Sequence, residues 1–519
     1  MKRALVSVSD KTGLIDFLKP FVEKGLEIIS TGGTLKFLIE AGLKAVDVSQ
    51  VTNFPEVLDG RVKTLHPNIH MGLLARRELD SHVQQMNQHQ VQFFDLVVGN
   101  LYPFEKTALN INSTFEEQIE NIDIGGPSFL RSAAKNYQNV IVVSDPADYQ
   151  WVQDKCLTNS ISLTDRKKLA LKVFSLTSYY DALIFQKLSN EDSDSENLTD
   201  YLNLPLKKKQ NLRYGENAHQ SATWFTNPLI EKNLADAEII QGKELSYNNL
   251  LDLDAAAELV ARFSEPACIA VKHNNPCGAA MAENIYLATK KTVESDPKSI
   301  FGGILAFNKI VDIETVEYLH PIFLECLIAP DYTPEALVKL STKKNLRVLK
   351  WPQLSIVENN KIYKSISGGM LLQDSDFFHS DIFNNENISI IGEKPSDSIY
   401  QDMLFGEKIC AALKSNAIAL VCNGQTVGLG MGQVNRIDSV NLAISRMKNF
   451  MKEHPIDIKK VVAISDAFFP FADSVSEFHQ VGIEWIFQPG GSVKDNDVIE
   501  YINKNKMNMV LSGQRHFRH

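Results

Sequence analysis

Short aliphatic runs alternate with helical stretches between residues 4 and 145, and this alternation limits the fold more than any other feature. The runs RALVSVSD, LEIIS, FFDLVVGN and NVIVVSDP have the length and the Val/Ile content of buried strands. Helical stretches such as KTGLIDFLKPFVEKG lie between them. Because strands that alternate with helices favour a mostly parallel sheet with helices on its faces, we predict an α/β fold.

The chain has 519 residues, which is too long for a single hydrophobic core. The segment from Asn190 to Asp200 contains five acidic residues and no Lys or Arg, as is typical of a solvated linker. We therefore predict one domain over residues 1–199, with its sheet within 1–145 and a helical extension after it. The second domain is predicted over residues 200–519.

Composition excludes several classes of function. The net charge of −10 argues against general binding of nucleic acid, whose phosphates attract basic surfaces. No apolar run approaches the roughly 20 residues that span a bilayer, and the N-terminus is typical of a first strand, not of a signal peptide. Six scattered cysteines without a Cys-x-x-Cys pair suit a reducing cytoplasm. We expect a cytoplasmic protein with no nucleic-acid or membrane partner.

The stretch ACIAVKHNNPCGAA, from Ala267 to Ala280, is the strongest candidate for a site. Its apolar run is typical of a buried strand that ends at Lys272 and His273, and the small residues at 279 and 280 predict the start of a helix. Ligands of α/β sheets bind outside the carboxyl ends of strands. An imidazole there can accept a proton near neutral pH, and an ammonium can stabilise developing negative charge. An isolated Lys-His pair is as often a solvated turn, but two asparagines beside it favour a site.

A second group of polar residues follows the first two predicted strands. Ser7, Ser9 and Lys11 follow one strand, and Thr31-Gly32-Gly33-Thr34 leads from the next strand into a helix. Because a helix N-terminus presents free N–H groups, this pattern predicts a phosphate cradle.

Two histidines four residues apart, His66 and His70, raise the question of a metal site. Pro67 argues against one helix that presents both, and neither a carboxylate nor a cysteine lies near them in the sequence. We predict no metal site.

The motif Lys-His-x-Asn-Pro-Cys-Gly resembles the central motif of the AICAR transformylase/IMP cyclohydrolase family, and further motifs of that family recur along the whole chain. The resemblance implies an N-terminal sheet like that of methylglyoxal synthase and a C-terminal transformylase domain of duplicated, cytidine-deaminase-like α/β units. Polar strand tips near residues 273 and 466 are consistent with such a duplication.

For the C-terminal domain the resemblance implies transfer of a formyl group from 10-formyltetrahydrofolate to the 5-amino group of aminoimidazole carboxamide ribonucleotide (AICAR), which gives FAICAR. His273 would be the base, Lys272 would stabilise the oxyanion and Asn416 would orient the transferring group. Nucleotide contacts are implied for Arg213, Tyr214, Asn249, Arg436 and Arg515, and folate contacts for Phe468 and Asp473. The chain departs from the family motifs at Ala218, where Pro is usual, and at Met431 and Asn435.

For the N-terminal domain the resemblance implies ring closure of FAICAR to inosine monophosphate (IMP) with loss of water. Asp123 and Lys135 would move protons, and Lys63 and Tyr102 would stabilise the oxyanion. The implied nucleotide-binding residues are Ser7, Ser9, Lys11, Thr31, Gly32, Gly33, Thr34, Arg61 and Thr64.

Two other functions remain open from the residues. A zinc-dependent nucleotide deaminase is suggested by Pro276-Cys277, although Ala280 stands where a second cysteine would be and no His-x-Glu precedes it. A non-catalytic regulator that binds purine nucleotides is the other. The family resemblance implies no tightly bound cofactor, and it implies a homodimer whose transformylase site is shared between subunits.

Overall fold

The computed structural model describes residues 1–189, 200–230, 232–354, 361–376, 378 and 388–519. It divides into two compact units. Unit 1 comprises Met1–Lys207 and Phe225–Ile230, and unit 2 comprises Lys208–Trp224 and Glu231–His519. The predicted linker from Asn190 to Asp200 lies, apart from its last residue, outside the described residues.

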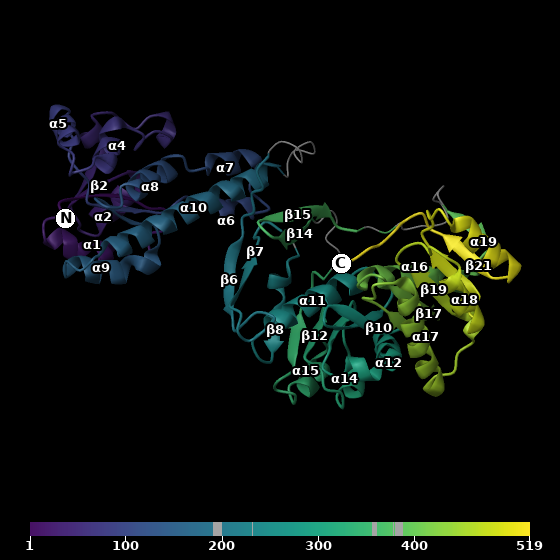
Figure 1. Ribbon diagram of the computed structural model, residues 1–519. Coiled ribbons are helices and arrows are strands. Elements are labelled where there is room, and N and C mark those ends of the chain that lie inside the picture. Colours follow the sequence, from purple (N-terminus) through teal and green to yellow (C-terminus); the bar gives the residue numbers. More distant parts are fainter. Residues whose placement is uncertain (190–199, 231, 355–360, 377, 379–387) are drawn as a thin grey trace. The chain divides into compact units, whose positions relative to one another are not determined.

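Unit 1, purple to blue in Figure 1, is built on a five-stranded sheet of order β3-β2-β1-β4-β5 in which every pairing is parallel. The prediction of a mostly parallel sheet in this part of the chain is confirmed. Its strands are β1 (Arg3–Ser7), β2 (Glu27–Ser30), β3 (Ala45–Asp47), β4 (Leu96–Gly99) and β5 (Ile141–Val143).

Several helices pack on this sheet through an apolar face. In α1 (Leu14–Glu23) the buried residues Leu14, Phe17, Leu18 and Phe21 recur at the spacing of one helix face. The other helices of unit 1 are α2 (Gly32–Glu40), α3 (Val48–Thr52), α4 (Pro67–Leu74), α5 (Asp80–Gln88), α6 (Phe104–Ala108), α7 (Phe115–Glu120), α8 (Gly125–Lys135), α9 (Tyr149–Leu157) and α10 (Leu163–Ser189).

Unit 2 is built on a twelve-stranded sheet of order β16-β21-β20-β19-β17-β18-β10-β9-β11-β12-β13-β8. Its strands are β8 (Glu238–Gln241), β9 (Ala267–Lys272), β10 (Asn275–Met281), β11 (Ile304–Phe307), β12 (Cys326–Ala329), β13 (Arg347–Lys350), β16 (Ser389–Ile391), β17 (Ile418–Cys422), β18 (Gln425–Gly430), β19 (Val462–Ser465), β20 (Trp485–Gln488) and β21 (Asn508–Leu511). Its helices are α11 (Tyr247–Val260), α12 (Ile285–Ser295), α13 (Pro297–Ile300), α14 (Ile313–Leu319), α15 (Pro334–Leu340), α16 (Asp397–Ala412), α17 (Arg436–Glu453), α18 (Asp473–Gln480) and α19 (Asp495–Lys504). Two short ladders stand apart from both sheets, β6 (Lys207–Leu212) with β7 (Ala222–Thr226) and β14 (Lys361–Ile366) with β15 (Gly369–Asp374).

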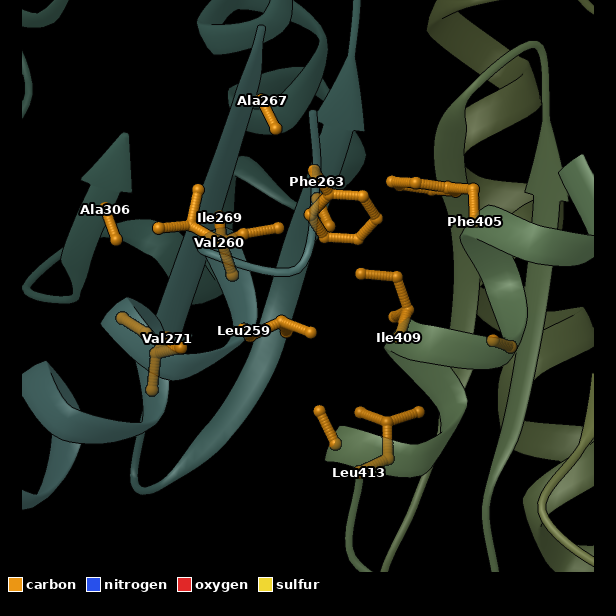
Figure 2. Close-up of a cluster of buried hydrophobic side chains, with 14 of the residues drawn as sticks. Leu259, Val260, Phe263, Ala267, Ile269, Val271, Ala306, Phe405, Ile409 and Leu413 are labelled. Atoms are coloured by element: carbon orange, nitrogen blue, oxygen red, sulfur yellow. The ribbon is translucent and has the colours of Figure 1, made fainter. Parts of the chain in front are cut away.

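The order of the large sheet is the same from either edge, which shows an internal duplication. The first repeat runs from β8 to β13 and the second from β16 to β21, and each contains a helix, a hairpin, a second helix and three further strands. The strands β10 and β18 pair antiparallel in the middle of the sheet, so a pseudo-twofold axis passes between them. The two repeats share one hydrophobic core, in which Phe263 and Phe405 face each other with ring centroids 5.4 Å apart (Figure 2).

One local prediction is wrong. Ala279 and Ala280 do not start a helix, because they belong to strand β10 of a hairpin. A small residue is needed at position 278 of the same strand, since a Cβ atom on Gly278 would lie 2.6 Å from the carbonyl oxygen of Thr292 in α12. The prediction that one helix does not present both His66 and His70 is confirmed, because α4 begins at Pro67 and His66 precedes it as an extended N-cap residue.

The predicted duplication is confirmed, but the two tips near 273 and 466 are not equivalent. His273 corresponds to Asn423 in the turn between β17 and β18. Asp466 follows β19 and corresponds to Asn308, which follows β11. None of the described helices is long and apolar enough to cross a membrane.

Candidate active sites

The first candidate site centres on the turn between β9 and β10. Lys272 ends β9, and the next two residues, His273 and Asn274, adopt left-handed backbone conformations with φ values of 55° and 59°. Positive φ at both central residues is typical of a type I′ hairpin turn. The side chain of His273 is exposed, and Lys272 Nζ donates a hydrogen bond of 2.7 Å to the carbonyl oxygen of Phe301. The turn therefore projects an imidazole and an ammonium from one end of the central hairpin.

Asp252, on α11, holds this turn in place. Its Oδ2 accepts from the backbone N–H of His273 at 3.2 Å, and its Oδ1 accepts from that of Asn274 at 2.5 Å. Partial burial raises the pKa of the Asp252 carboxyl, while the two backbone hydrogen bonds act in the opposite direction. The turn thus rests on a carboxylate contributed by the preceding helix.

The second repeat contributes the loop before β17 to the same end of the hairpin. The backbone N–H of Lys414 donates to Asn275 Oδ1 at 3.1 Å, which joins this loop to the β9–β10 turn. The peptide bond between Ser415 and Asn416 is cis. The Asn416 side chain donates to the carbonyl oxygen of Gln433 at 2.9 Å and accepts from Arg436 Nη2 at 2.9 Å. Four of the predicted residues, Lys272, His273, Asn416 and Arg436, are therefore brought to one region.

Arg436 and Asn249, both predicted to contact nucleotide, already have partners within the protein. The buried Arg436 guanidinium forms an ion pair with Asp466 and also donates to Ser465 Oγ at 2.9 Å. The buried Asn249 side chain accepts from the backbone N–H and the hydroxyl of Ser246 in a capping box at the start of α11. In this structure both side chains stabilise the protein around the site.

The other residues predicted for unit 2 lie nearer the surface. Arg213 is exposed and lies over the ring of Tyr214, with 5.6 Å between its guanidinium carbon and the ring centroid. Arg515 is also exposed and lies in the same way over the neighbouring Phe517 ring, at 4.8 Å. Phe468 is partly buried, two residues after Asp466, and Asp473 is the exposed first residue of α18.

The second candidate site lies at the carboxyl edge of the unit 1 sheet. The hydroxyls of Ser7 and Thr31 lie 3.0 Å apart, at the ends of neighbouring strands. Asn100, after β4, accepts from the backbone N–H of Ser9 at 2.6 Å, and Lys11 Nζ donates to the carbonyl oxygen of Ser9 at 3.4 Å. The Thr34 hydroxyl accepts from the backbone N–H of Val8 and donates to the Val8 carbonyl oxygen, so Thr34 supports the loop.

Lys63 and Thr64 lie against two helix N-termini of this edge. A Cβ atom on Gly32, the first residue of α2, would lie 3.3 Å from Lys63 Nζ, and one on Gly125, the first residue of α8, would lie 3.0 Å from Thr64 Oγ1. Lys63 also forms an ion pair with Glu56 at 2.9 Å. A glycine at position 32, where φ is +40°, leaves room for the ammonium; Gly33, beside it, has no neighbour that a Cβ would meet within 4 Å.

Asp123 lies beside Tyr102 at the same edge. Its carboxylate accepts from the backbone N–H of Gly126 at 2.7 Å and of Tyr102 at 3.4 Å. Burial raises the pKa of Asp123, against the effect of these two hydrogen bonds. A carboxyl group with a raised pKa is suited to proton transfer near neutral pH. The Tyr102 side chain is exposed, and the exposed Arg61 forms an ion pair with Glu120.

Lys135 is not close to these residues within unit 1. It is the exposed last residue of α8, whose first residue Gly125 lies at the sheet edge. Ten residues of helix separate the two Cα atoms by about 15 Å, because an α-helix rises about 1.5 Å per residue.

Sequence reasoning missed Asp252 and gave Asp466 no role. The signal that finds Asp252 is a repeat, because Asp402 lies at the matching place before the second hairpin and makes the same pair of backbone hydrogen bonds. Among the described residues, no group of three or more His, Cys, Asp or Glu side chains could hold a metal ion.

Comparison with known proteins assigns a family model to each of two segments of the chain. A family model described as "MGS-like domain" matches residues 13–128, which includes most of the parallel sheet. A second model, described as "AICARFT/IMPCHase bienzyme", matches residues 133–446, more than half of the chain. The chain belongs to the AICARFT/IMPCHase bienzyme family, and it is a bifunctional AICAR formyltransferase and IMP cyclohydrolase.

Relatives of the same length support this assignment. The "Bifunctional purine biosynthesis protein PurH" of Caldicellulosiruptor saccharolyticus is 48% identical over 522 residues, and that of Bacillus subtilis is 47% identical over 522 residues; each alignment covers 100% of both chains. The structure titled "Crystal structure of ForH" has 31% identity and a TM-score of 0.33 over 36% of this chain and 98% of that chain, too small a likeness to carry an argument. The family match leaves the deaminase and regulator alternatives without support.

Proposed function

We propose that the two activities are divided between the two units, with formyl transfer at the β9–β10 turn and ring closure at the carboxyl edge of the unit 1 sheet. The observation that carries this proposal is the turn itself. A carboxylate holds it in a left-handed conformation, it presents Lys272 and His273, and it is joined to the loop that contains Asn416. The two steps are consecutive in purine biosynthesis, since the product of the first is the substrate of the second.

In the first step the AICAR amine would attack the formyl carbon of 10-formyltetrahydrofolate. The new bond from the amine nitrogen to the formyl carbon forms, the bond from that carbon to the folate nitrogen breaks, and one proton moves from the amine to the folate nitrogen. His273, which is exposed at the turn, would accept the proton of the attacking amine. The Lys272 ammonium donates one hydrogen bond to Phe301, and its two remaining N–H groups can stabilise the oxyanion.

The other predicted residues of unit 2 would hold the two substrates. Asn416 would orient the formyl group, with its own amide fixed by Gln433 and Arg436. The exposed Arg213 and Arg515 would bind the AICAR phosphate, with Tyr214 and the Arg436 and Asn249 regions around the nucleotide. Phe468 and Asp473 would contact the folate.

In the second step the carboxamide nitrogen of FAICAR would add to the formyl carbon, and water would leave. Asp123 is suited to move the proton, because burial raises its pKa. Lys63 and Tyr102 would stabilise the oxyanion. The N-terminus of α2, with Ser7, Ser9, Lys11 and Thr31 around it, would bind the nucleotide phosphate.

Lys135 is the least supported member of this set, since about 15 Å of helix separates it from the α8 N-terminus. We keep it as a candidate for proton movement that a single substitution tests. We also propose that the protein is a homodimer in the cytoplasm, with no nucleic-acid or membrane partner. Formyltetrahydrofolate would act as a cosubstrate and not as a tightly bound cofactor.

The test uses the full-length chain and both half-reactions, each followed by absorbance. His273→Ala should abolish formyl transfer and leave ring closure of supplied FAICAR unchanged. Asp123→Asn should do the reverse, because its site lies in the other unit. Lys135→Ala should also impair only ring closure if this lysine acts there. Equal damage to both reactions from either of the first two variants would contradict the division of activities.

A further inference from the structure

The two hairpins of unit 2 are held by the same device. Asp252 lies 21 and 22 residues before the two turn residues whose N–H groups it binds, His273 and Asn274. Asp402, on α16, has the same spacing to Asn423 and Gly424, with hydrogen bonds of 2.7 and 2.6 Å. In both turns the two central residues have positive φ, at 51° and 66° in the second turn. The chain therefore contains a matched pair of carboxylates that differ in the turn they support.

The two turns differ in how strongly their sequences favour this conformation. Asn-Gly is the preferred sequence of a type I′ turn, so the Asn423-Gly424 turn forms readily by itself. His273-Asn274 places two side chains in the left-handed region, which glycine adopts more readily than either residue. The first turn therefore depends on its aspartate more than the second does.

The backbone conformation of the turn also fixes where the imidazole points. The Cα–Cβ bond of His273 would change direction if the residue relaxed from positive to negative φ. A displacement of about 1 Å of a reacting group can reduce a rate about 100-fold. Asp252 also interacts electrostatically with His273, and a positive charge on the imidazole favours the ionised carboxylate.

We infer that Asp252 is a positioning residue for formyl transfer, which holds the His273 backbone in the left-handed conformation that aims the imidazole at the substrate amine. This inference rests on the proposed role of His273. It assigns to Asp252 a function that Asp402, with the same hydrogen bonds, does not have.

The experiment compares Asp252→Ala with the matched control Asp402→Ala in the full-length protein. Each substitution removes one carboxylate and leaves two backbone N–H groups of one turn without their acceptor. Asp252→Ala should lower kcat of formyl transfer about 10- to 100-fold, with KM for AICAR changed less than about threefold. Asp402→Ala should leave kcat within about twofold of the unsubstituted protein. Equal loss of kcat in both, or no loss in Asp252→Ala, would overturn the inference.

A rescue variant separates backbone positioning from other roles of the carboxylate. Asn274→Gly gives the first turn the glycine that the second turn has at Gly424, so this turn should form without Asp252. Asp252→Ala combined with Asn274→Gly should recover at least about tenfold in kcat over Asp252→Ala alone. Absence of recovery would overturn the inference. If Asp252→Ala does not fold, Asp252→Asn, which keeps one acceptor oxygen, takes its place in both comparisons.

His273→Ala, measured in parallel, distinguishes a failure of the proposed function from a failure of the role inferred for Asp252. Full formyl transfer in His273→Ala would overturn the proposed function, and the inference about Asp252 with it. An inactive His273→Ala together with a fully active Asp252→Ala would overturn only the role of Asp252.

Discussion

The buried ion pair between Arg436 and Asp466 offers the sharpest test of how unit 2 is stabilised, because the first repeat provides its neutral counterpart. Arg436 is the first residue of α17, and the matching first residue of α12 is Ile285. Asp466 follows β19 and accepts from the backbone N–H of Ala417 at 3.0 Å. The matching Asn308 follows β11 and accepts from the N–H of Ala267 at 2.8 Å. At this position of the repeat the backbone thus needs a side-chain acceptor oxygen, which Asn or Asp can supply. The negative charge of Asp466 is needed only to pair with Arg436.

Asp466→Asn keeps an acceptor for the backbone but leaves a guanidinium without its counter-ion. The side chains of Arg436 and Asp466 are 8% and 0% exposed, so the unpaired charge would remain buried. Breaking a buried pair in this way costs about 3–5 kcal/mol. The double substitution Arg436→Ile and Asp466→Asn reproduces the residues of the first repeat, and it should be within about 1–2 kcal/mol of the unsubstituted protein. Its formyl transfer should nevertheless be impaired, because Asn416 loses the Arg436 donor.

Urea unfolding followed by tryptophan fluorescence measures the stability of these variants, since three of the four tryptophans lie in unit 2. The free energy of unfolding of unit 2 is taken from its transition midpoint at constant m value. A double variant that is no more stable than Asp466→Asn would refute the reasoning. So would a cost of less than about 1 kcal/mol for Asp466→Asn alone.

Two further predictions concern unit 2. Burial lowers the pKa of His516, but hydrogen bonds to Asp376 and Glu407 outweigh it and raise the pKa from 6.5 to about 9. Because the pKa is raised in the folded state, protonated His516 stabilises the protein; this stabilisation, roughly 3 kcal/mol, is complete below about pH 6.5 and is lost as the pH rises through 9. The urea midpoint of unit 2 should therefore fall over this pH range. His516→Gln should make the midpoint depend less on pH. A Cβ atom on Gly430 would overlap the backbone of α17 at Ser439, so Gly430→Ala should cost about 1–3 kcal/mol in the same assay. Gly369→Ala, in the exposed strand β15, where the nearest atom lies 3.8 Å away, is its control and should have little effect; an equal loss in both would contradict the packing argument.

Local sequence pattern was enough to predict β1, β2, β4 and β5 of the unit 1 sheet, because each is a short aliphatic run between turn residues, but it missed the three-residue strand β3. The same reasoning failed at Ala279 and Ala280. They lie in a hairpin strand that packs against α12 at Gly278, a contact between segments that the local pattern does not report.

Contacts between distant segments also explain what was missed at the sites. Asp252 lies 21 residues before His273, and its function depends on the packing of α11 beside the hairpin. The role of Lys135 stays a prediction. Lys135 lies ten residues after Gly125 on the same helix, which separates their Cα atoms by about 15 Å, a distance that the sequence motif alone does not report.

The duplication explains why the proposed transfer site of unit 2 lies at one end of its central hairpins and not at both. The pseudo-twofold axis between β10 and β18 generates two equivalent ends, each formed by the turn of one repeat and the loop before the first hairpin strand of the other. At one end the turn carries Lys272 and His273, and the loop adds Asn416, supported by a buried arginine. At the other end the turn carries Cys422 and Asn423, and the arginine is replaced by isoleucine. Because the proposed site takes its residues from both repeats, neither repeat alone can form it, and the shared core between α11 and α16 is what holds its two halves together (Figure 2).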